Sequence, residues 1–330
     1  MSNIKDVAKL ANVSISTVSY ALNNTGNVSD ETKKKILDAA KKLDYRPSGI
    51  ARSLKTKKTE IIGIFLNNFN GPIYGEIIRG VRDIAKSNGY EVVVAECMAS
   101  KNTVTRLFGQ KIVDGAIVLS ADISDKIIKE YASKSFPIVT LDRELKGDFI
   151  SSVLIDNKNA AYNAIKFIAE QGYKDILLIN GPKGTYDSEK RYEGYQEGIK
   201  QYNLNLKDDW DCIGNFEEES GYRILKRVIE SGNLPEVVCA ANDEMAIGAI
   251  KALKEHNIKI PEDVAVIGFD DIPLCEYITP KLTTIRRPAY DLGVLATHTL
   301  FNNLKGNYDG RSKMLSTEFI IRETLVEREK

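Results

Sequence analysis

Two groups of residues in this 330-residue sequence have types and spacings that suit recognition chemistry. The first is the run DVAKLANVSISTVSYALN, in which two short segments with apolar faces flank a turn at Val13-Ser14. Two helices joined in this way can place the second helix in the major groove of DNA, where side chains contact base edges. A three-helix bundle whose polar face contacts only water is the alternative interpretation. We predict that the side chains facing the bases are Ser14, Ile15, Ser16, Thr17, Tyr20 and Asn23.

The second group consists of polar and aromatic side chains near the ends of predicted buried strands. Open parallel sheets bind ligands at the carboxyl ends of their strands, and two such sheets can face each other across a cleft. Carboxylates, an amide and a guanidinium around an aromatic ring suit a ligand ring with several hydroxyl groups, each of which donates and accepts hydrogen bonds. The candidates at these positions are Tyr74, Asp142, Arg191, Phe216, Asn242 and Asp270.

Capping is the alternative role for the Asp and Asn members of this second group. Short polar side chains are favoured at helix starts and in turns, so Asp142, Asn242 and Asp270 could each serve there. We expect the neighbouring Asp243 and Asp271 to be such caps. The single tryptophan is expected to be a packing or surface residue and not a ligand platform.

Enzyme chemistry has little support in the sequence. The two histidines, His256 and His298, are too few for a metal cluster, and no pairing of a nucleophile with a base is visible. Neither GxGxxG nor GxxxxGK[ST] follows the first predicted strand. The four cysteines lack CxxC spacing and lie mostly in apolar runs, which favours buried thiols in a reducing compartment. We therefore expect no catalytic residue, no metal and no cofactor.

Alternating apolar runs and amphipathic segments after Glu60 predict two parallel sheets wound by helices, an α/β architecture of two lobes. The predicted strands are 61–66, 92–95, 116–119, 138–141, 176–179, 237–240, 264–267 and 316–321. The predicted helices are 73–87, 159–171, 189–202, 220–230, 244–256 and 289–304.

The first 46 residues predict three short helices, which form an all-α head. Asn3 with Asp6 resembles a capping pair, Ser14 is a suitable N-cap for a helix through Leu22, and Ser29 is suited to cap the third helix. We assign residues 1–46 to a DNA-binding head and 47–59 to a linker. The body then divides into an amino-proximal lobe, 60–157 with 288–315, and a carboxy-proximal lobe, 158–287 with 316–330.

Charge is distributed unevenly along the chain although the net charge is zero. Residues 1–59 contain 12 basic and 5 acidic residues, whereas the remainder contains 34 basic and 41 acidic residues. A basic head on an acidic body indicates a protein that contacts phosphates with one end only. The beginning of the sequence shows no apolar segment followed by a small-residue cleavage site, and no apolar run reaches the length of a membrane span. We expect a cytoplasmic protein.

These features occur together in a known family. The sequence resembles regulators of the LacI/GalR (lactose/galactose repressor) type over nearly its whole length, with matching pieces in the family's order and spacing. The matching pieces are IKDVAKLANVSISTVSYALNN, VSDETKKKILDAAKKLDYRPSGIARSLKTKKTEIIGI, VDGAIVL, SEKRYEGYQEGI, AANDEMAIGAIKAL, IPEDVAVIGFDDI and PKLTTIRRP.

The resemblance implies a helix-turn-helix head and a two-lobed body like that of periplasmic binding proteins. It also implies that Asp142, Arg191, Asn242 and Asp270 are polar contacts of an effector and that Phe216 stacks on it, with Tyr74 in the facing loop. The segment from Ser48 to Leu54 would form a hinge helix on a pseudo-palindromic operator, with Leu54 wedged into the minor groove beside Ala51. Tyr20 departs from the arginine that several members carry, so the base preference of those members does not transfer.

A hinge that works only as a pair implies a homodimer, and no leucine heptads follow the last predicted strand to join dimers into tetramers. We expect a repressor whose effector is a sugar, a sugar phosphate or a related compound, with purines as a weaker option. One alternative is a catabolite-control regulator that uses a phosphorylated phosphocarrier protein as co-repressor. That partner would dock on the helix from Asp291 to Asn303, which lacks a basic and aromatic pattern. Another alternative, a periplasmic-type sugar-binding module, would not carry the basic head.

Overall fold

The computed structural model describes residues 2–23, 25–46, 58–67, 69–97, 101–110, 112–141 and 143–326. The chain divides into two compact units, Met1–Thr59 and Glu60–Lys330, which we call the head and the body. The predicted hinge residues Ser48, Ala51 and Leu54 lie outside the described residues, as does Asp142. No helix in the described ranges is long and apolar enough to cross a membrane.

The head contains three helices, α1 (Ile4–Ala11), α2 (Ile15–Asn23) and α3 (Asp30–Lys42). Their starts are set by the predicted caps. Asn3 and Asp6 form a reciprocal capping box, and the Ser29 hydroxyl accepts the backbone N–H of Thr32. The helices pack around one apolar cluster, which consists of Val7, Ala8, Val18, Ala21, Ile36, Ala39 and Ala40.

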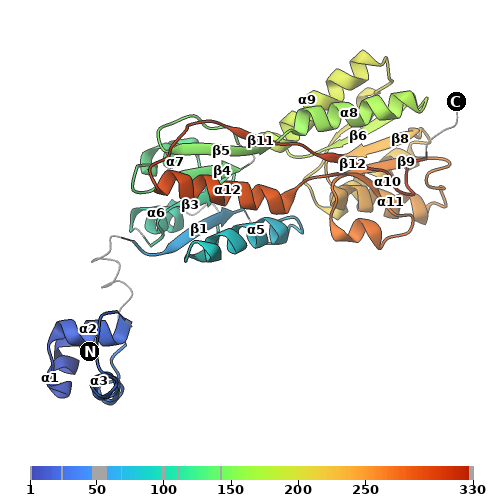
Figure 1. Ribbon diagram of the computed structural model, residues 1–330. Helices are drawn as coiled ribbons and strands as arrows, with labels where there is room; N and C mark the ends of the chain where they lie inside the picture. Colours follow the sequence, from blue (N-terminus) through green and yellow to red (C-terminus); the bar gives the residue numbers. More distant parts are fainter. Residues whose placement is uncertain are drawn as a thin grey trace. The chain divides into compact units, whose positions relative to one another are not determined.

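The amino-proximal lobe of the body is built on a six-stranded parallel sheet in the order β11-β5-β4-β3-β1-β2 (Figure 1). One face packs against α5 and α12, and the other packs against α6 and α7. The strands are β1 (Ile61–Leu66), β2 (Glu91–Glu96), β3 (Ala116–Val118), β4 (Ile138–Leu141), β5 (Ile150–Ile155) and β11 (Lys313–Leu315). The helices are α5 (Tyr74–Ser87), α6 (Lys101–Gly109), α7 (Asp125–Tyr131) and α12 (Ala289–Leu304).

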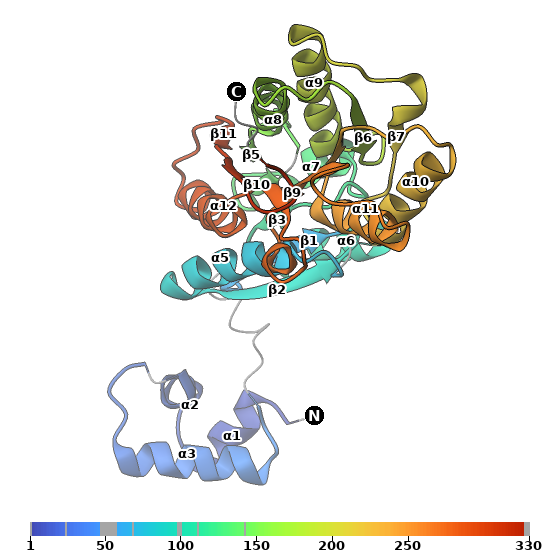
Figure 2. The same ribbon diagram turned by 90° about the vertical axis from the view of Figure 1, so that its right-hand side faces the viewer.

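The carboxy-proximal lobe repeats this plan in the order β12-β10-β9-β8-β6-β7, with β12 antiparallel to β10. Figure 2 shows α8 and α9 on one side of the sheet and α10 and α11 on the other. The strands are β6 (Ile176–Asn180), β7 (Asp211–Ile213), β8 (Val237–Ala240), β9 (Ala265–Asp270), β10 (Thr283–Arg286) and β12 (Glu318–Ile320). The helices are α8 (Asn157–Glu170), α9 (Tyr186–Gln201), α10 (Glu218–Glu230) and α11 (Asp243–Glu255), with 3-10 turns η1 (Asp208–Trp210) and η2 (Pro273–Glu276).

The chain passes between the two lobes three times, from β5 to α8, from β10 to α12 and from β11 to β12. Crossings of this kind place the carboxyl ends of both sheets next to the interlobe space. Side chains at the first two crossings, Asn157 and Arg287, are both buried. They therefore belong to the structural link between the lobes as well as to the space between them.

Several elements differ from the sequence predictions. The structure contains β5, β7, β10, β11, α6 and α7, none of which the patterns predict. Two differences bear on the candidate site. Helix α9 begins at Tyr186, so Arg191 lies inside the helix and does not open it. Strand β9 extends through Asp270, so this carboxylate belongs to the last residue of the strand and does not follow it.

The prediction that the cysteine thiols are buried is confirmed, and of the two roles expected for the tryptophan the structure shows packing. Cys97, Cys212, Cys239 and Cys275 are all buried and free. Trp210 is fully buried in the apolar cluster between α10, α11 and the carboxy-proximal sheet.

Candidate functional site

The predicted DNA-facing side chains lie on the solvent side of α2. Ile15 and Tyr20 are 45% and 48% exposed, so both side chains are accessible from the solvent. Ser14, Ser16 and Asn23 are exposed, and Thr17 is half-buried. Exposed hydroxyl, amide and apolar groups on one helix can contact both base edges and thymine methyl groups.

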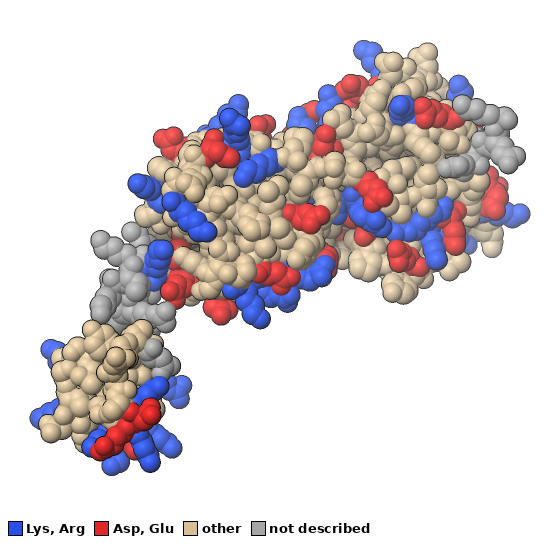
Figure 3. All heavy atoms as spheres, in the orientation of Figure 1, with Lys and Arg blue, Asp and Glu red and all other residues tan. Residues whose placement is uncertain are grey.

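Hydrogen bonds within the helix hold part of this surface in place. The Ser14 hydroxyl lies 2.7 Å from the hydroxyls of both Ser16 and Thr17, and Asn23 donates to the Ser19 carbonyl at 2.8 Å. Since α2 carries no charged residue, phosphate contacts must come from elsewhere in the head. Figure 3 shows Lys and Arg side chains on several sides of the head, with Asp and Glu side chains among those on its lower side.

A cleft of about 660 Å³ lies between the two lobes of the body. Its volume is in the range that holds a small ligand. Five of the six predicted effector residues line it, and they come from three helix or strand ends, the interior of α9 and one loop. These five are Tyr74, Arg191, Phe216, Asn242 and Asp270. Contact of any of them with an effector stays a prediction.

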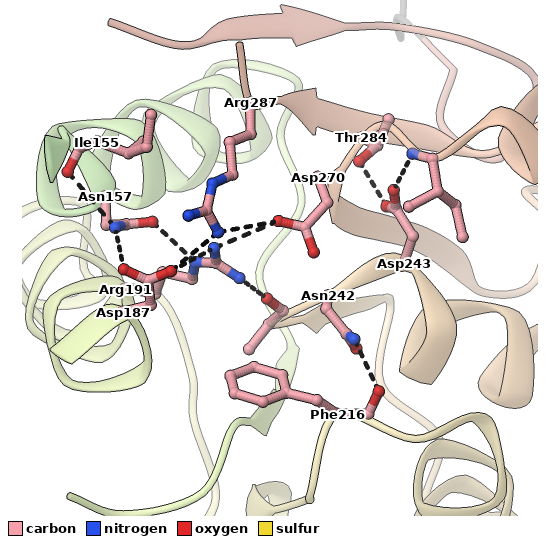
Figure 4. Close-up of polar contacts among 12 residues, drawn as sticks. Ile155, Asn157, Asp187, Arg191, Phe216, Asn242, Asp243, Asp270, Thr284 and Arg287 are labelled. Carbon is pink, nitrogen blue, oxygen red and sulfur yellow. Dashed lines mark hydrogen bonds and ion pairs between the residues drawn. The ribbon is translucent and has the colours of Figure 1, made fainter. Parts of the chain in front are cut away.

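Arg191 is the centre of a buried polar network (Figure 4). Its Nε donates to Asn157 Oδ1 at 2.9 Å, its Nη1 donates to the Ala241 carbonyl, and its Nη2 lies 3.3 Å from Asp270 Oδ1. The guanidinium also lies over the Phe269 ring, 3.6 Å from its centre. Only 2% of Arg191 is exposed, so most of its donors are used within the protein.

Asp187 connects this network to the second crossing between the lobes. Its Oδ2 accepts from Arg287 at 3.0 Å and lies 3.5 Å from Arg191 Nη2, and its Oδ1 accepts from Asn157 at 2.9 Å. Arg287 Nη1 is also 4.0 Å from Asp270 Oδ1. Burial raises the pKa of Asp270, although the charges of Arg191 and Arg287 both act to lower it.

Phe216 is held in a constrained position at the edge of the cleft. Its φ of 70° lies in the left-handed region, which costs a non-glycine residue energy. Its carbonyl accepts from Asn242 Nδ2 at 2.8 Å, and its ring lies so close to Gly181 that a Cβ there would be 2.3 Å from Cζ. The ring is therefore fixed before any ligand arrives, as a stacking platform requires.

Asn242 serves as a helix cap in addition to lining the cleft. Its Oδ1 accepts the Met245 backbone N–H at 3.0 Å at the start of α11, which is the capping role considered from the sequence. Its Nδ2 has a second N–H and its Oδ1 a second lone pair, so the capped amide can still form a hydrogen bond with an effector.

The expectation that Asp243 and Asp271 are caps is wrong. Asp271 forms ion pairs with Arg286 and Arg322, each at 2.7 Å. Asp243 is fully buried, where its carboxylate accepts from Thr284 Oγ1 at 2.5 Å and from the Ile272 N–H at 2.9 Å. Only one residue can cap α11, and Asn242 occupies that position, so the next side chain turns toward β10 (Figure 4).

Asp243 makes the stability of the body depend on pH. Burial, followed by the charge of Asp270, raises the pKa of Asp243 from 3.8 to about 7. The native state then keeps this proton to a higher pH than the unfolded chain does, so the free energy of unfolding falls as pH rises from about 4 to about 7. In Asp243→Asn this loss, on the order of 2–4 kcal/mol, should be absent. Urea unfolding of the parent protein and of Asp243→Asn at a series of pH values measures this loss. If the free energies of unfolding of the two proteins change in parallel with pH, Asp243 does not hold the proton.

Several polar residues of the cleft were not predicted from the sequence. On the carboxy-proximal side these are Asp187, Arg287 and the underlying Asn157, and on the amino-proximal side they include Asn67 and Arg143. Asp187 had a detectable signal, because it precedes Arg191 by one helical turn on α9. Asn67 directly follows β1, where the strand-end rule applies, and its Oδ1 accepts from Ser120 Oγ at 2.7 Å.

Among the described residues no group of three His, Cys, Asp or Glu side chains is placed to hold a metal ion.

The head and the cleft together define the class: a helix-turn-helix unit joined in one chain to a two-lobed ligand-binding body.

Comparison with known proteins gives the family. Residues 3–48 match the model of bacterial regulatory proteins of the lacI family, and residues 165–325 match a periplasmic binding protein-like domain. The chain is 35% identical to the probable HTH-type transcriptional repressor ExuR of Bacillus subtilis, over 98% of each chain. This chain belongs to the lacI family of transcriptional regulators.

Two solved structures of the family extend the comparison to bound ligands. A complex of the transcriptional regulator CelR with cellobiose is 26% identical, with a TM-score of 0.73 over 98% of this chain and 100% of the other. A LacI family regulator from Enterococcus faecium with bound ribose is 26% identical, with a TM-score of 0.74 over 82% of this chain and 100% of the other.

Proposed function

We propose that this regulator is a repressor whose affinity for its operator changes when a sugar or sugar derivative binds between the lobes of the body. The observation that carries the proposal is the cleft itself, which joins a fixed aromatic ring to acidic, amide and guanidinium groups from both lobes. The cellobiose and ribose bound to the two solved family members support a ligand of this class.

The chemistry of the cleft suits a ring with many hydroxyl groups. Phe216 offers an apolar face, while Asn67, Asn215 and Asp270 contribute amide and carboxylate groups to the lining of the cleft. A hydroxyl group can donate to a carboxylate and accept from an amide, so one sugar ring can satisfy several of these groups. Burial of an unpaired carboxylate would cost about 1–3 kcal/mol or more, which favours ligands that complete these bonds.

The proposal assigns DNA reading to the exposed side chains of α2, principally Ile15, Ser16 and Tyr20. The proposal also includes a hinge helix at Ser48–Leu54, a homodimer, and two lobes with the boundaries that we predict from the sequence. A homodimer would place one copy of α2 on each half of a pseudo-palindromic site.

The co-repressor alternative has no comparable support. Most of α12 is buried against α5 and the amino-proximal sheet, and its exposed side chains include Asp291, His298 and Asn302. Between Ala289 and Leu304 the helix has no lysine or arginine that would receive a phosphorylated protein.

A two-step experiment tests the proposal. A melting-temperature screen of the full chain against neutral sugars, uronates, sugar phosphates and purines identifies the ligand, because binding stabilises the native state. An operator selected from random DNA duplexes then serves to measure affinity with and without that ligand. If purines raise the melting temperature and no sugar or sugar derivative does, the proposed effector class is wrong.

Phe216→Ala should weaken binding of the ligand from the screen by about 1 kcal/mol or more, a factor of about five to ten in Kd. The physical reason is the loss of stacking area. Phe216→Tyr retains the ring and should retain the affinity. Isothermal titration calorimetry measures both variants, and equal Kd values for the alanine variant and the parent protein would remove Phe216 from the site.

A further inference from the structure

The wall of the cleft contains an unusual piece of backbone at the carboxyl end of β9. Asp270 and the next residue, Asp271, have φ values of 113° and 57°, so two successive non-glycine residues have positive φ. The value for Asp271 lies in the left-handed helical region, which aspartate tolerates, but the value for Asp270 lies beyond it. Backbone of this kind persists only where the surrounding structure holds it in place.

This turn directs the two carboxylates to different partners. Asp270 lines the cleft, and its Oδ1 lies 3.3 Å from Arg191 Nη2 (Figure 4). Asp271 does not line this cleft, and each of its oxygens pairs with a different guanidinium group. Its Oδ1 lies 2.7 Å from Arg322 Nη1, and its Oδ2 lies 2.7 Å from Arg286 Nε. The turn therefore separates a carboxylate that faces the cleft from one that anchors the backbone.

Arg322 brings a distant part of the chain to this anchor, since it follows β12 in the sequence. Its side chain is 10% exposed, whereas that of Arg286 is 44% exposed. Arg322 Nη1 also donates to the Leu282 carbonyl at 2.9 Å, and the Arg322 backbone N–H donates to Thr283 Oγ1 at 2.8 Å. Burial and these bonds make Arg322 the more restrained of the two partners of Asp271.

A separate hydrogen bond holds the residue that follows the turn. Ile272 lines the cleft, and its backbone N–H donates to Asp243 Oδ2 at 2.9 Å. The other oxygen of Asp243 accepts from Thr284 Oγ1 of β10 at 2.5 Å. Ile272 would therefore stay bound if the ion pair of Asp271 were lost, and the relaxing backbone would move mainly the Asp270 carboxylate.

We propose that Arg322 is a positioning residue for the effector site. Through its ion pair with Asp271 it holds the strained turn that directs Asp270 into the cleft. The inference rests on the proposed function, because it gives the segment after β12 a role in effector binding. Arg322 itself does not line the cleft, so its removal lowers the affinity without removing a group that contacts the effector.

The first test follows the turn without any ligand, by amide hydrogen exchange of the full chain. In Arg322→Ala, a peptide that spans residues 268–273 should exchange at least about tenfold faster than in the unmodified chain, because its amides open more often. Peptides of the central strand β8 should keep their rates. Equal exchange of residues 268–273 in the two proteins overturns the inference.

Glu276→Ala is the matched control for this test. Glu276 is the other ion-pair partner of Arg322, at 3.2 Å, and its side chain is 62% exposed. The substitution removes this pair and leaves the pair between Arg322 and Asp271. Exchange of residues 268–273 should therefore stay close to that of the unmodified chain.

The second test measures the affinity of the cleft for a sugar of known identity. The probe is whichever of glucose, galactose, ribose, cellobiose, glucuronate and galacturonate raises the melting temperature of the unmodified chain most. Arg322→Ala should raise the Kd of this probe by at least about tenfold, and Glu276→Ala should leave it within a factor of about two. Isothermal titration calorimetry measures both values.

Two substitutions of Asp271 separate a positioning role from a general loss of stability. Both glycine and alanine remove the ion pairs, but only glycine adopts positive φ without a steric cost. Asp271→Gly should therefore bind the probe at least about threefold more tightly than Asp271→Ala. A purely stabilising ion pair predicts no advantage for glycine, which loses more conformational entropy on folding. Added to Asp271→Gly, Arg322→Ala should leave the Kd unchanged, because the two residues act as one unit.

The outcomes distinguish this inference from the proposed function. If none of the six probes binds, that result counts against the proposed sugar effector, and the exchange experiment decides the role of Arg322. If a probe binds, an unchanged Kd in Arg322→Ala overturns the inference. Binding by Asp271→Gly that is no tighter than binding by Asp271→Ala also overturns it. If Arg322→Ala does not fold, the comparison of the two Asp271 variants decides.

Discussion

A protein that lacks residues 1–59 is expected to lose all detectable operator binding and to keep a folded body. The described part of the head holds the exposed α2 surface, and residues 1–59 carry the excess of basic over acidic residues. Glu60–Lys330 forms a compact unit of its own, so its fold should survive the truncation. Electrophoretic mobility shift titrations at several salt concentrations measure the loss, and circular dichroism with melting of the truncated protein measures the fold.

The salt dependence makes this prediction specific. Binding through lysine and arginine releases counterions from DNA, so the affinity of the full chain should fall steeply with salt. The truncated body is predominantly acidic and should show no such binding. Salt-dependent DNA binding by the truncated body would mean that the interface lies outside the head.

Arg191→Ala is expected to lower the free energy of unfolding of the body by roughly 3–5 kcal/mol, the cost of removing one partner of a buried charge pair. The change leaves Asp187 and Asp270 in the interior with one guanidinium between them, and it removes the donor to the Ala241 carbonyl. Urea unfolding at constant pH measures the effect. Effector binding should also weaken, because Asp270 would lose the group that positions it.

Arg223→Ala is the control variant, because it removes an ion pair within a helix at an exposed position and so separates the loss of the pair from the effect of burial. Arg223 pairs with Glu219 at the same helical spacing as Arg191 with Asp187, but its side chain is 68% exposed. Exposed pairs of this kind contribute about 0.5 kcal/mol. Similar destabilisation by the two substitutions would contradict the role given to burial.

The sequence predicts the elements of this fold where burial and periodicity coincide. Strands such as β1 and β8 are continuous apolar runs, and helices such as α5 and α12 show an apolar face, so both kinds are recognisable. Strand β5 is missed because it contains Ser151 and Ser152, which are buried with hydrogen-bond partners that only the folded chain supplies. The Ser152 hydroxyl, for example, lies 2.8 Å from that of Thr140.

Prediction of the candidate site from the sequence has the same limit, because contacts between distant segments cannot be read from local patterns. The strand-end rule finds Asn242 and Asp270 because it depends on local sequence and sheet topology. It does not find Arg287, which follows the unrecognised β10 and meets Asp187 across 100 residues of chain. The capping preference misassigns Asp243, since this side chain is bound by Thr284 of the unrecognised β10.

The coupling between the cleft and the operator is the central claim, and one measurement tests it most directly. Fluorescence anisotropy of a labelled operator duplex, titrated with the full chain, gives the operator Kd with and without the ligand from the melting screen. The ligand should change this Kd by at least about tenfold, equivalent to roughly 1.4 kcal/mol of coupling. An unchanged operator Kd at ligand concentrations that calorimetry shows to saturate the cleft would contradict the claim.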